Sequence, residues 1–275
     1  MSNLVPVRSD CWELDSLFDA FAPGAAERAV LDLGPGWDLR WTAGWRASGR
    51  TEERAARELE PGTLEGYEPV RRFSWRQRQR HRPGLEFLVS TGRLHGFESL
   101  EERSLLVALD FAGAVAEVLS QPFRLRFLTG SGELREHVPD FLAALRDGSR
   151  HLFDVRPAAL IGQGDATCFA AAAEAALAVG WRYSVVAGWR PHALAALDAL
   201  SAQRRPLEDR LGLQDRLLRG AADGAAAFGD LVAATPLPAV ARAHALHLLW
   251  HRRLGTDLSR PLSDRSPVWR SGARP

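Results

Sequence analysis

The segment HVPDFLAALRDGSRHLFDVRP, residues 137–157, decides the fold of this chain. It contains two apolar runs, residues 138–145 and 151–155, and each has the length and composition of a β-strand. Between them stands the tripeptide Arg-Asp-Gly, residues 146–148, and an Asp-Gly pair is typical of a hairpin turn. The segment therefore predicts an antiparallel hairpin.

The length of the turn fixes which residues of the two strands face each other. A three-residue loop with Gly148 in the left-handed conformation pairs Leu145 with Ser149, and it sets Asp140 opposite Asp154. A two-residue loop would shift the register by one residue and separate the two acids. The hairpin chemistry favours the first arrangement, so we expect both carboxylates on one face of the sheet.

Arg156 is expected on the same face, because side chains alternate along a strand and this residue follows Asp154 by two positions. Burying a carboxylate in an apolar segment is costly without a partner, and Mg²⁺ is the usual partner of clustered carboxylates. In a metal-dependent phosphodiesterase the acids hold Mg²⁺, while a cation orients water or offsets charge on the phosphate. We therefore expect Asp140, Asp154 and Arg156 to form a nuclease site.

The composition sets broad limits. The chain has 275 residues and a net charge of +1, which suits one or two domains and gives no bulk signal for nucleic-acid binding. Cys11 and Cys168 each lack a nearby second cysteine, which argues against disulfides and zinc–thiolate sites and favours a reducing cytoplasm. We recognise neither a signal peptide nor a bilayer-spanning apolar run, so we expect no membrane partner. The chain contains no lysine.

A basic segment precedes the acidic one. Residues 71–82 contain six arginines, two aromatic residues and no acid. Arginines interleaved with aromatic side chains bind phosphates and stack on bases, so this basic arm predicts contact with DNA. The alternative is a solvated arm that pairs with acidic protein surface. The candidate DNA-binding residues of the arm are Arg71, Arg72, Arg76, Arg78, Arg80 and Arg82.

Residues 99–110 predict a helix with an apolar stripe and with Ser99 as its N-cap. Glu102 has two interpretations. Ser99-x-x-Glu102 is a capping box, in which the glutamate binds back to the helix N-terminus. Alternatively, Glu102 faces the hairpin carboxylates and joins a metal site, and the spacing alone does not separate these roles. Glu98 and Glu101 are expected to face solvent.

The rest of the middle of the chain predicts strands at residues 115–119, 123–128 and 181–187 and a helix at about residues 165–179. This order suits an α/β fold, a mixed sheet flanked by helices. An α/β crossover is expected between Asp154 and the last strand.

Residues 1–70 carry no motif and are the least informative part of the chain. Within them, residues 10–21 read as a short amphipathic helix, residues 31–45 as interrupted strands, and residues 51–59 as a charged, solvated segment. We therefore leave the structure of residues 1–70 open, treat residues 71–190 as the α/β core with its basic arm, and separate residues 191–275 as a C-terminal module.

The C-terminal module is predicted to be mainly helical. Residues 228–234 and 239–253 read as helix, turn, helix, and residues 254–258 and 267–269 as the two strands of a small wing, which resembles a winged-helix module. The alternative is a plain helical appendage. The side chains of His244, His247 and His251 share one helical face at metal-like spacing. Because no carboxylate joins them, we favour a polar or partner-facing stripe over a metal site.

Six short motifs match one protein family in order and spacing. They are Gln79–Gly84, Phe97–Glu102, Gln121–Phe123, His137–Phe141, Asp154–Pro157 and Gly180–Tyr183. On these motifs, the region from about residue 75 to 187 resembles the TnsA-like endonuclease subunits of heteromeric transposases, in the version common in actinobacteria. The resemblance implies a restriction-endonuclease-like core and a Mg²⁺-dependent DNA endonuclease that cuts one strand at a transposon end.

The resemblance also implies roles for individual residues. Glu102 and Asp140 would ligate Mg²⁺, or Mn²⁺ in its place, and Asp154 stands at the acidic position of the last motif as the third ligand. Gln121 and His137 would lie close to the site and touch phosphate or water. The implied catalytic residues are Glu102, Gln121, Asp140, Asp154 and Arg156, and His137 joins the DNA-binding residues.

Arg156 occupies the position that is normally lysine in this family. Arginine stays charged and presents a planar fork, so the exchange is not conservative and weakens the expectation of activity. One alternative is a weak or inactive DNA-binding scaffold of the same complex. Another is a defence or repair nuclease with the same core, which the neighbouring genes would distinguish. The partners implied by the resemblance are transposon-end DNA, an integrase-type transposase subunit and an AAA-type ATPase regulator.

Overall fold

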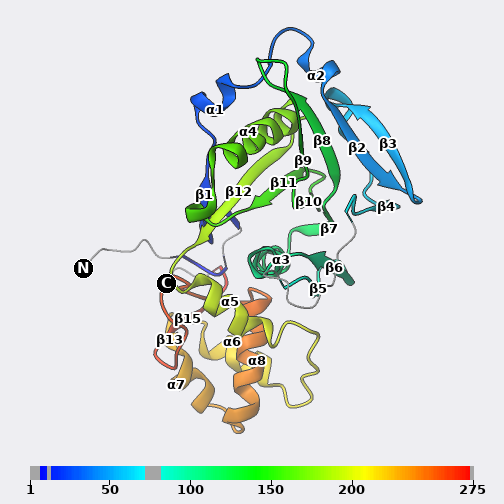
Figure 1. Cartoon of the computed structure of the whole chain (residues 1–275). Coiled ribbons are helices and arrows are strands. Elements are labelled where there is room, and N and C mark those ends of the chain that lie inside the picture. The colour runs from blue at the N-terminus through cyan, green and yellow to red at the C-terminus, as the bar shows by residue number, and fades with distance from the viewer. Residues whose placement is uncertain (1–6, 11–13, 72–81, 273–275) are drawn as a thin grey trace. The chain divides into compact units, whose positions relative to one another are not determined.

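The computed structural model describes residues 7–10, 14–71 and 82–272 (Figure 1). The chain contains both helices and several β-sheets, so it has a mixed α/β fold, as the sequence predicts. None of the helices in the described ranges is long and apolar enough to cross a membrane.

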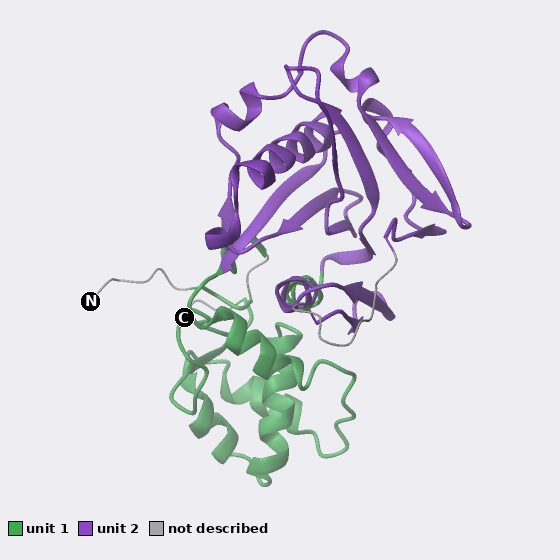
Figure 2. Cartoon of the chain, viewed as in Figure 1, with its two compact units in different colours: residues 1–18, 107–113, 189–275 green, residues 19–106, 114–188 purple. Residues whose placement is uncertain are grey.

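The chain divides into two compact units, shown in Figure 2. The larger unit comprises residues 19–106 and 114–188, and the smaller unit comprises residues 1–18, 107–113 and 189–275. Residues 19–70, whose structure the sequence leaves open, are part of the larger unit. The smaller unit contains all of the predicted C-terminal module, residues 191–275, together with two short segments from earlier in the chain.

A five-stranded sheet carries the hairpin of residues 137–157. In order across the sheet, its strands are β1 (Phe18–Phe21), β12 (Arg182–Trp189), β11 (Arg150–Val155), β10 (Phe141–Leu145) and β7 (Val115–Ser120). Strand β10 runs antiparallel to β11 and β7, and β11 runs parallel to β12. The mixed pairing follows from the two kinds of connection, a tight turn between β10 and β11 and a helical crossover between β11 and β12.

The hairpin has the register that the turn chemistry predicts. Phe141 lies opposite Phe153 in the last pair of the ladder, and the Leu145 N–H donates to the Ser149 carbonyl over 2.9 Å. Gly148 has φ of 87°, in the left-handed region that side chains with a Cβ atom avoid. The three-residue loop is therefore confirmed. Regular pairing ends before Asp140, whose N–H donates to the Phe153 carbonyl, so Asp140 lies near Asp154 without being its ladder partner.

Replacing Gly148 by alanine is expected to destabilise the protein by about 1 kcal/mol, a fall of about 2–4 °C in melting temperature. No other atom lies within 4 Å of a Cβ atom built there, so the cost is conformational and not steric. The control is Gly164→Ala in α4, where a Cβ also meets open space and φ is not positive. Chemical denaturation of both variants makes the comparison, and an equal effect at the two glycines would contradict the left-handed turn.

Helix α4 (Gln163–Ala178) connects β11 to β12 and forms the predicted crossover. The Asp165 carboxylate accepts the backbone N–H of the N-cap residue Gly162 over 3.0 Å, and Gly180 has φ of 73° just after the helix ends. In Figure 1 the helix lies across β11 and β12. Its buried alanines belong to the same apolar cluster as residues of both large sheets.

A second sheet of five strands stands beside the first within the larger unit. Its strands are β3 (Arg50–Ala55), β2 (Thr42–Ala47), β8 (Phe123–Leu128) and β9 (Leu134–His137) in that order, with β4 (Tyr67–Glu68) pairing with β2. The sequence predicts one mixed sheet for this region, and that expectation is wrong, because β7 and β8 are consecutive in the chain but belong to different sheets.

Two corners take the chain from one sheet to the other. Between β7 and β8, Gln121 has φ of 48° and precedes Pro122, which lacks a backbone N–H and cannot continue a ladder. Between β9 and β10 the chain turns at residues 138–140. The first strand of the predicted hairpin, β10, therefore begins at Phe141 and not at residue 138 as predicted. The two corners are joined, since the Gln121 N–H donates to the Asp140 carbonyl over 2.7 Å.

The aromatic core of the larger unit explains why residues 19–70 fold with it. Trp41 and Trp45 are fully buried and lie against Phe127 and Phe123, with ring centroids 5.5 and 5.0 Å apart. Burial of such large side chains stabilises the packed sheets by several kcal/mol. The strand β2 that carries Trp45 is thus as much part of the core as the strands of the hairpin.

Two expectations for the N-terminal region are wrong, and a third holds for most of its residues. In the described part of residues 10–21 the chain forms a 3₁₀ turn (Leu14–Ser16) and strand β1, because pairing with β12 outweighs the helical pattern. Residues 31–45 contain only one strand segment, the start of β2, and otherwise α2 (Trp37–Arg40), which follows α1 (Ala25–Ala29). Residues 51–59 are predicted to be charged and solvated, and the side chains of Thr51, Glu52, Glu53, Arg57 and Glu58 are exposed on edge strand β3 and the 3₁₀ turn that follows it (Ala56–Glu58), whereas Leu59 is fully buried.

A two-stranded hairpin and a helix complete the larger unit near the site. Strands β5 (Gly84–Leu88) and β6 (Arg93–Phe97) pair antiparallel, and α3 (Leu100–Ala112) follows, as the sequence predicts for residues 99–110. Arg103 of α3 donates to the Glu86 carboxylate over 2.7 Å, which ties the helix to the hairpin. This ion pair helps to hold the first turn of α3, where Glu102 lies.

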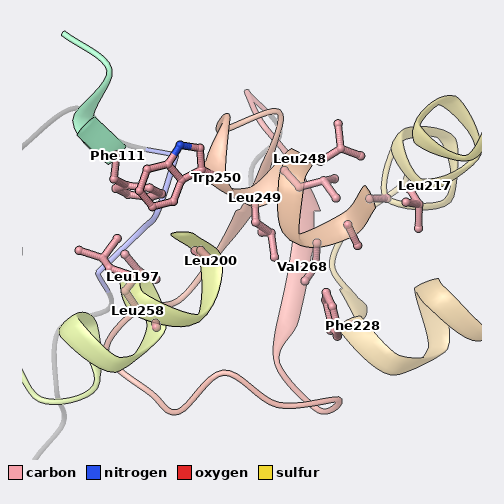
Figure 3. Packing of buried hydrophobic residues seen from close by; sticks show 14 of the residues in the cluster. Phe111, Leu197, Leu200, Leu217, Phe228, Leu248, Leu249, Trp250, Leu258 and Val268 are labelled. Atoms are coloured by element: carbon pink, nitrogen blue, oxygen red, sulfur yellow. The ribbon is translucent and has the colours of Figure 1, made fainter. Parts of the chain in front are cut away.

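The smaller unit packs four helices and a small sheet around one apolar core (Figure 3). The elements are α5 (Ala193–Ser201), α6 (Leu213–Gly220), β13 (Ala226–Ala227), α7 (Phe228–Ala233), α8 (Pro238–Trp250), β14 (Leu254–Thr256) and β15 (Pro267–Arg270). Phe228, Leu249 and Val268 lie in this core, so α7, α8 and the sheet share it. Strand β15 pairs antiparallel with both β14 and β13.

The three histidines of α8 and its C-terminal cap hold a loop. The rings of His247 and His251 lie 2.8 and 3.0 Å from the carbonyls of Gln203 and Arg204, and that of His244 lies 3.3 Å from the amide of Gln214. The residues between α5 and α6 are thereby fixed against α8. The helical face that these histidines share therefore packs against other residues of the smaller unit.

Candidate active site

A cavity of about 570 Å³ lies in the larger unit, next to the corner between β9 and β10. Six acids line it, namely Glu98, Glu101, Glu102, Asp140, Asp154 and Asp165. Arg71, Arg156 and His137 line it as well. All three predicted carboxylate ligands thus face one cavity, and acidic side chains outnumber arginines among the described residues of its wall.

Asp140 stands at the start of β10, where the corner fixes its backbone. Its Oδ2 accepts the Val155 N–H over 2.7 Å, and its own N–H donates to the Phe153 carbonyl over 3.0 Å. Burial raises the pKa of Asp140 well above its usual range, and the neighbouring charges of Asp154 and Glu102 raise it further. Such mutual repulsion between carboxylates is what a bound cation relieves.

Asp154 is buried and is held by two side-chain donors. The Tyr183 hydroxyl donates to its Oδ2 over 2.6 Å, and the Nε2 atom of His137 lies 3.0 Å from both oxygens. Burial raises the pKa of Tyr183 well above 10, and the negative charge of Asp154 adds to the shift, so the phenol stays protonated and remains a donor. Asp154 is therefore fixed in orientation at the cavity wall.

Glu102 makes the contacts of a helix cap. Its carboxylate accepts the Ser99 hydroxyl over 2.9 Å and the Glu98 N–H over 2.7 Å, while its own N–H donates to the Ser99 hydroxyl over 3.2 Å. Burial, followed by the charge of Glu98, raises the pKa of Glu102 although these hydrogen bonds lower it. The structure is consistent with both roles predicted for Glu102, helix cap and metal ligand, because the carboxylate that caps the helix also lines the cavity. Glu98 and Glu101, expected to face solvent, line it too.

Arg156 lines the cavity, and its guanidinium contacts Leu160 and Asp165. Its Nε donates to the Leu160 carbonyl over 3.3 Å, and an Nη atom lies 3.6 Å from the Asp165 carboxylate. The side chain is 44% exposed, so it can move at small cost. The structure thus places Arg156 on the expected side of the sheet, and the partner that it gives this residue comes from α4.

Gln121 is buried behind the corner and is not among the described residues that line the cavity. Its side-chain Oε1 is buried and makes no hydrogen bond within the described parts of the chain. The backbone of Gln121 bridges two segments, since its N–H binds the Asp140 carbonyl and its carbonyl accepts the Val70 N–H over 3.0 Å. In this structure Gln121 positions Asp140 through the main chain.

The predicted DNA-binding residues fall into two groups. Arg71 lines the cavity, Arg82 is exposed just before β5, and His137 binds Asp154. Arg72, Arg76, Arg78 and Arg80 lie outside the described residues. The two ends of the basic arm that the structure does describe are therefore on the larger unit, and one of them is in the cavity wall.

Tyr183 and Asp165 are functional contacts that the sequence reasoning did not assign to the site. Asp165 also caps the start of α4. Tyr183 stands in one of the family-like motifs, but its contact with Asp154 depends on the parallel register of β11 and β12. That register is set by the packing of α4, and no local sequence signal reports it.

The donor set suits Mg²⁺, because this ion prefers oxygen ligands from one or two carboxylates together with water. Within the described ranges, no three acids, histidines or cysteines converge on one point as ligands around an ion. The reason lies in the hydrogen bonds, since Glu102 turns toward Ser99 and Asp154 toward Tyr183 and His137. Chemically the residues fit a Mg²⁺ site, with Asp140 and Asp154 as its centre and Glu102 able to join after leaving its cap.

Comparison of the sequence with protein-family models finds no match. Comparison with curated proteins finds no matching relative either.

Replacing Glu102 by glutamine is expected to separate its two roles. Glutamine can still accept a hydrogen bond at the helix N-terminus, so we expect the melting temperature to change by less than about 2 °C. Glu102→Ala removes the cap and should cost about 1 kcal/mol. Both variants should lose metal-dependent nicking of DNA if Glu102 is a ligand. If a folded Glu102→Gln protein nicks DNA at the full rate, Glu102 serves as a helix cap and not as a metal ligand.

Proposed function

We propose that this chain is a Mg²⁺-dependent DNA endonuclease of the TnsA-like type, with a restriction-endonuclease-like core, which cuts one strand at a transposon end. The observation that carries the proposal is the convergence of Asp140, Asp154 and Glu102 in the wall of one cavity. Burial, and after it the charges of Asp154 and Glu102, raises the pKa of Asp140, which is typical of a carboxylate cluster that binds a cation.

The fold around the cavity supports the proposal. Strands β7, β10, β11 and β12 form a mixed sheet, α3 precedes it, and α4 makes the parallel crossover. This is the arrangement that the resemblance implies for a restriction-endonuclease-like core. In the smaller unit, the order of α7, turn and α8 followed by the antiparallel pair β14 and β15 supports a winged-helix module.

Each side chain has a distinct task in the proposed reaction. Glu102, Asp140 and Asp154 would hold Mg²⁺, which when bound supplies charge stabilisation and a more acidic water. The Val155 N–H, bound to one oxygen of Asp140, fixes the direction in which its other oxygen points. The Arg156 guanidinium would leave Asp165 and offset the charge that develops on the phosphate.

A second candidate function is a catalytically weak scaffold subunit with the same fold. The contact of Arg156 with Asp165 and Leu160 favours it, because the guanidinium is occupied at the position where the family carries lysine. Arginine does not readily give up its proton, so it orients or activates water less well than lysine does. DNA binding and subunit contacts would remain in this case.

The partners follow from the same proposal. Arg71 in the cavity wall and exposed Arg82 would guide a phosphate backbone toward the carboxylates. An integrase-type transposase subunit would cut and join the other strand, and an AAA-type ATPase regulator would dock on this chain. A defence or repair nuclease would have the same cavity without these two proteins as partners.

The proposal is tested by nicking of a supercoiled plasmid that carries a transposon end, with the partner subunits supplied. We expect conversion to the open-circular form that requires Mg²⁺ or Mn²⁺ and stops when a chelator is added. Asp154→Asn, made beside the unaltered protein, should reduce the rate by about 10²-fold or more. Absence of nicking under all these conditions, with DNA binding retained, would favour the scaffold.

Replacing Arg76, Arg78 and Arg80 of the basic arm by alanine is expected to weaken binding to all DNA sequences alike. Phosphate contacts carry no base information, so specificity should stay the same. The slope of log affinity against log salt should become shallower by about one unit for each lost phosphate contact. Replacing Arg216 and Arg219 on α6 by alanine is the control, because it also removes arginine side chains but leaves the basic arm unchanged. An unchanged slope in the arm variant would assign the arm to a protein partner or to solvent.

A further inference from the structure

Asp154 is the most completely buried of the three central acids. Its side chain is only 3% exposed although it lines the cavity. A carboxylate so far removed from water must receive hydrogen bonds, because an unpaired buried charge costs several kcal/mol. The groups that satisfy it therefore decide where its remaining lone pairs point.

Two side chains from different strands satisfy Asp154. Tyr183 of β12 donates its hydroxyl to Oδ2 over 2.6 Å, and His137 at the end of β9 places Nε2 3.0 Å from each oxygen. Arg156 is engaged with Asp165 instead. The orientation of Asp154 is thus set by the Tyr183 hydroxyl and the His137 ring and not by the arginine two residues away.

The sheet register explains why a tyrosine is needed at position 183. Leu152 lies opposite Tyr183 in the parallel pair of β11 and β12, and Asp154 is the next residue on the same face of β11. Diagonal neighbours across strands are several ångströms apart, so only a long side chain brings a donor to the carboxylate. The Tyr183 ring also packs against the apolar cluster of the larger unit, which fixes the hydroxyl in place.

We propose that Tyr183, assisted by His137, is a positioning residue that orients the Asp154 carboxylate for a divalent cation at the cavity. The inference depends on the proposed function, in which Asp154 is a metal ligand. A carboxylate has about four lone-pair directions, and donors that occupy those on the protein side leave the others for the ion. Partners of this kind around metal ligands typically change metal affinity by about 10–100-fold when they are removed.

The test is Tyr183→Phe, which keeps the ring and its packing and removes only the hydroxyl. Calorimetric titration of the metal-free protein with Mn²⁺ should give an affinity weaker by about 10–100-fold. The Mg²⁺ concentration for half-maximal nicking should rise by the same factor, while the rate at saturating Mg²⁺ changes much less. If Tyr183 has a purely structural role, Tyr183→Phe should lower the melting temperature, and the Mg²⁺ concentration for half-maximal nicking should not rise while the rate at saturating Mg²⁺ stays the same.

The control is Tyr67→Phe, which removes the other tyrosine hydroxyl of the chain. That hydroxyl accepts a hydrogen bond from Arg54, and neither residue is among the described residues that line the cavity, so Mn²⁺ affinity should not change. At the second donor, His137→Gln can still offer an N–H to Asp154, whereas His137→Ala cannot. We expect Gln to retain most of the Mn²⁺ affinity that Ala loses.

The outcomes separate the inference from the proposed function. If the unaltered protein binds Mn²⁺, Asp140→Asn does not, and Tyr183→Phe binds as tightly as the unaltered protein, the positioning role is overturned and the metal site remains. If the unaltered protein does not bind Mn²⁺ even with DNA present, the proposed function fails and the inference fails with it. Weaker binding by Tyr183→Phe but not by Tyr67→Phe supports both.

Discussion

Replacing Asp140 by asparagine is expected to abolish nicking and, at the same time, to raise the melting temperature of the metal-free protein. The side-chain carbonyl of the new asparagine can still accept the Val155 N–H that now binds Oδ2, so the corner between β9 and β10 is kept. Burial and, after it, repulsion by Asp154 and Glu102 raise the pKa of Asp140, and asparagine removes the charge on which both effects act. We expect an increase of about 2–5 °C.

The loss of function should be much larger than the gain in stability. Without Asp140 the cation loses its central ligand, so the nicking rate should fall by about 10³-fold and the stabilisation by Mg²⁺ should disappear. Thermal melting with and without Mg²⁺, together with the plasmid assay, measures both effects on one preparation. Destabilisation of the metal-free Asp140→Asn protein would show that Asp140 has a structural role that the present account lacks.

The difference in melting temperature between Asp140→Asn and the unaltered protein should depend on pH. The pKa of Asp140 is raised above the unfolded value, so its carboxyl contributes stability below about pH 4 that is lost as the pH rises through the folded pKa. In metal-free buffer the melting temperature of Asp140→Asn should therefore exceed that of the unaltered protein by an amount that grows as the pH rises. His151, whose pKa burial lowers to about 3, destabilises both proteins below about pH 6.5 and does not alter the difference.

Replacing Arg156 by lysine is expected to increase nicking by about 10-fold, and replacing it by alanine to reduce nicking by about 10²-fold or more. Lysine orients and deprotonates water more readily, whereas arginine mainly offsets phosphate charge. Mg²⁺ affinity should be similar in all three proteins, because Asp140 and Asp154 hold the ion without this side chain. The measurement is the plasmid assay on the three proteins at saturating Mg²⁺, normalised to folded protein.

Asp165 supplies the matched control for Arg156. Asp165→Asn can still accept the Gly162 N–H at the start of α4, but it no longer binds the guanidinium by charge. If Arg156 serves the reaction after leaving Asp165, this variant should nick faster than the unaltered protein. Equal rates for the unaltered protein and Arg156→Lys would show that arginine is no handicap here. Inert Arg156→Lys protein, with partners and a correct DNA end present, would favour the scaffold.

The hairpin was predictable because its determinants are local. Gly148 in a three-residue loop fixes the register, which pairs Phe141 with Phe153 and so brings the neighbouring residues Asp140 and Asp154 to the same end of the hairpin. The capping contact of Glu102 with Ser99 was likewise readable from a spacing of three residues. These local rules describe the centre of the candidate site.

The remainder depends on contacts between residues far apart in sequence. Strand β1 forms because Phe18–Phe21 pairs with β12, and no pattern within residues 10–21 reports that partner. The division into two sheets follows from the corner at Gln121, whose left-handed backbone is not a property that its side chain predicts. Tyr183 and Asp165 reach the site through the packing of α4, which tertiary structure alone decides.

The most direct test of the central claim, that these carboxylates hold the metal used to cut DNA, is anomalous X-ray scattering from crystals of the protein soaked in Mn²⁺. We predict an anomalous peak in the cavity, in contact with the carboxylates of Asp140 and Asp154. The peak should be absent from crystals of Asp140→Asn treated in the same way. A peak only at another place, or none at a Mn²⁺ concentration that supports nicking, would contradict the account.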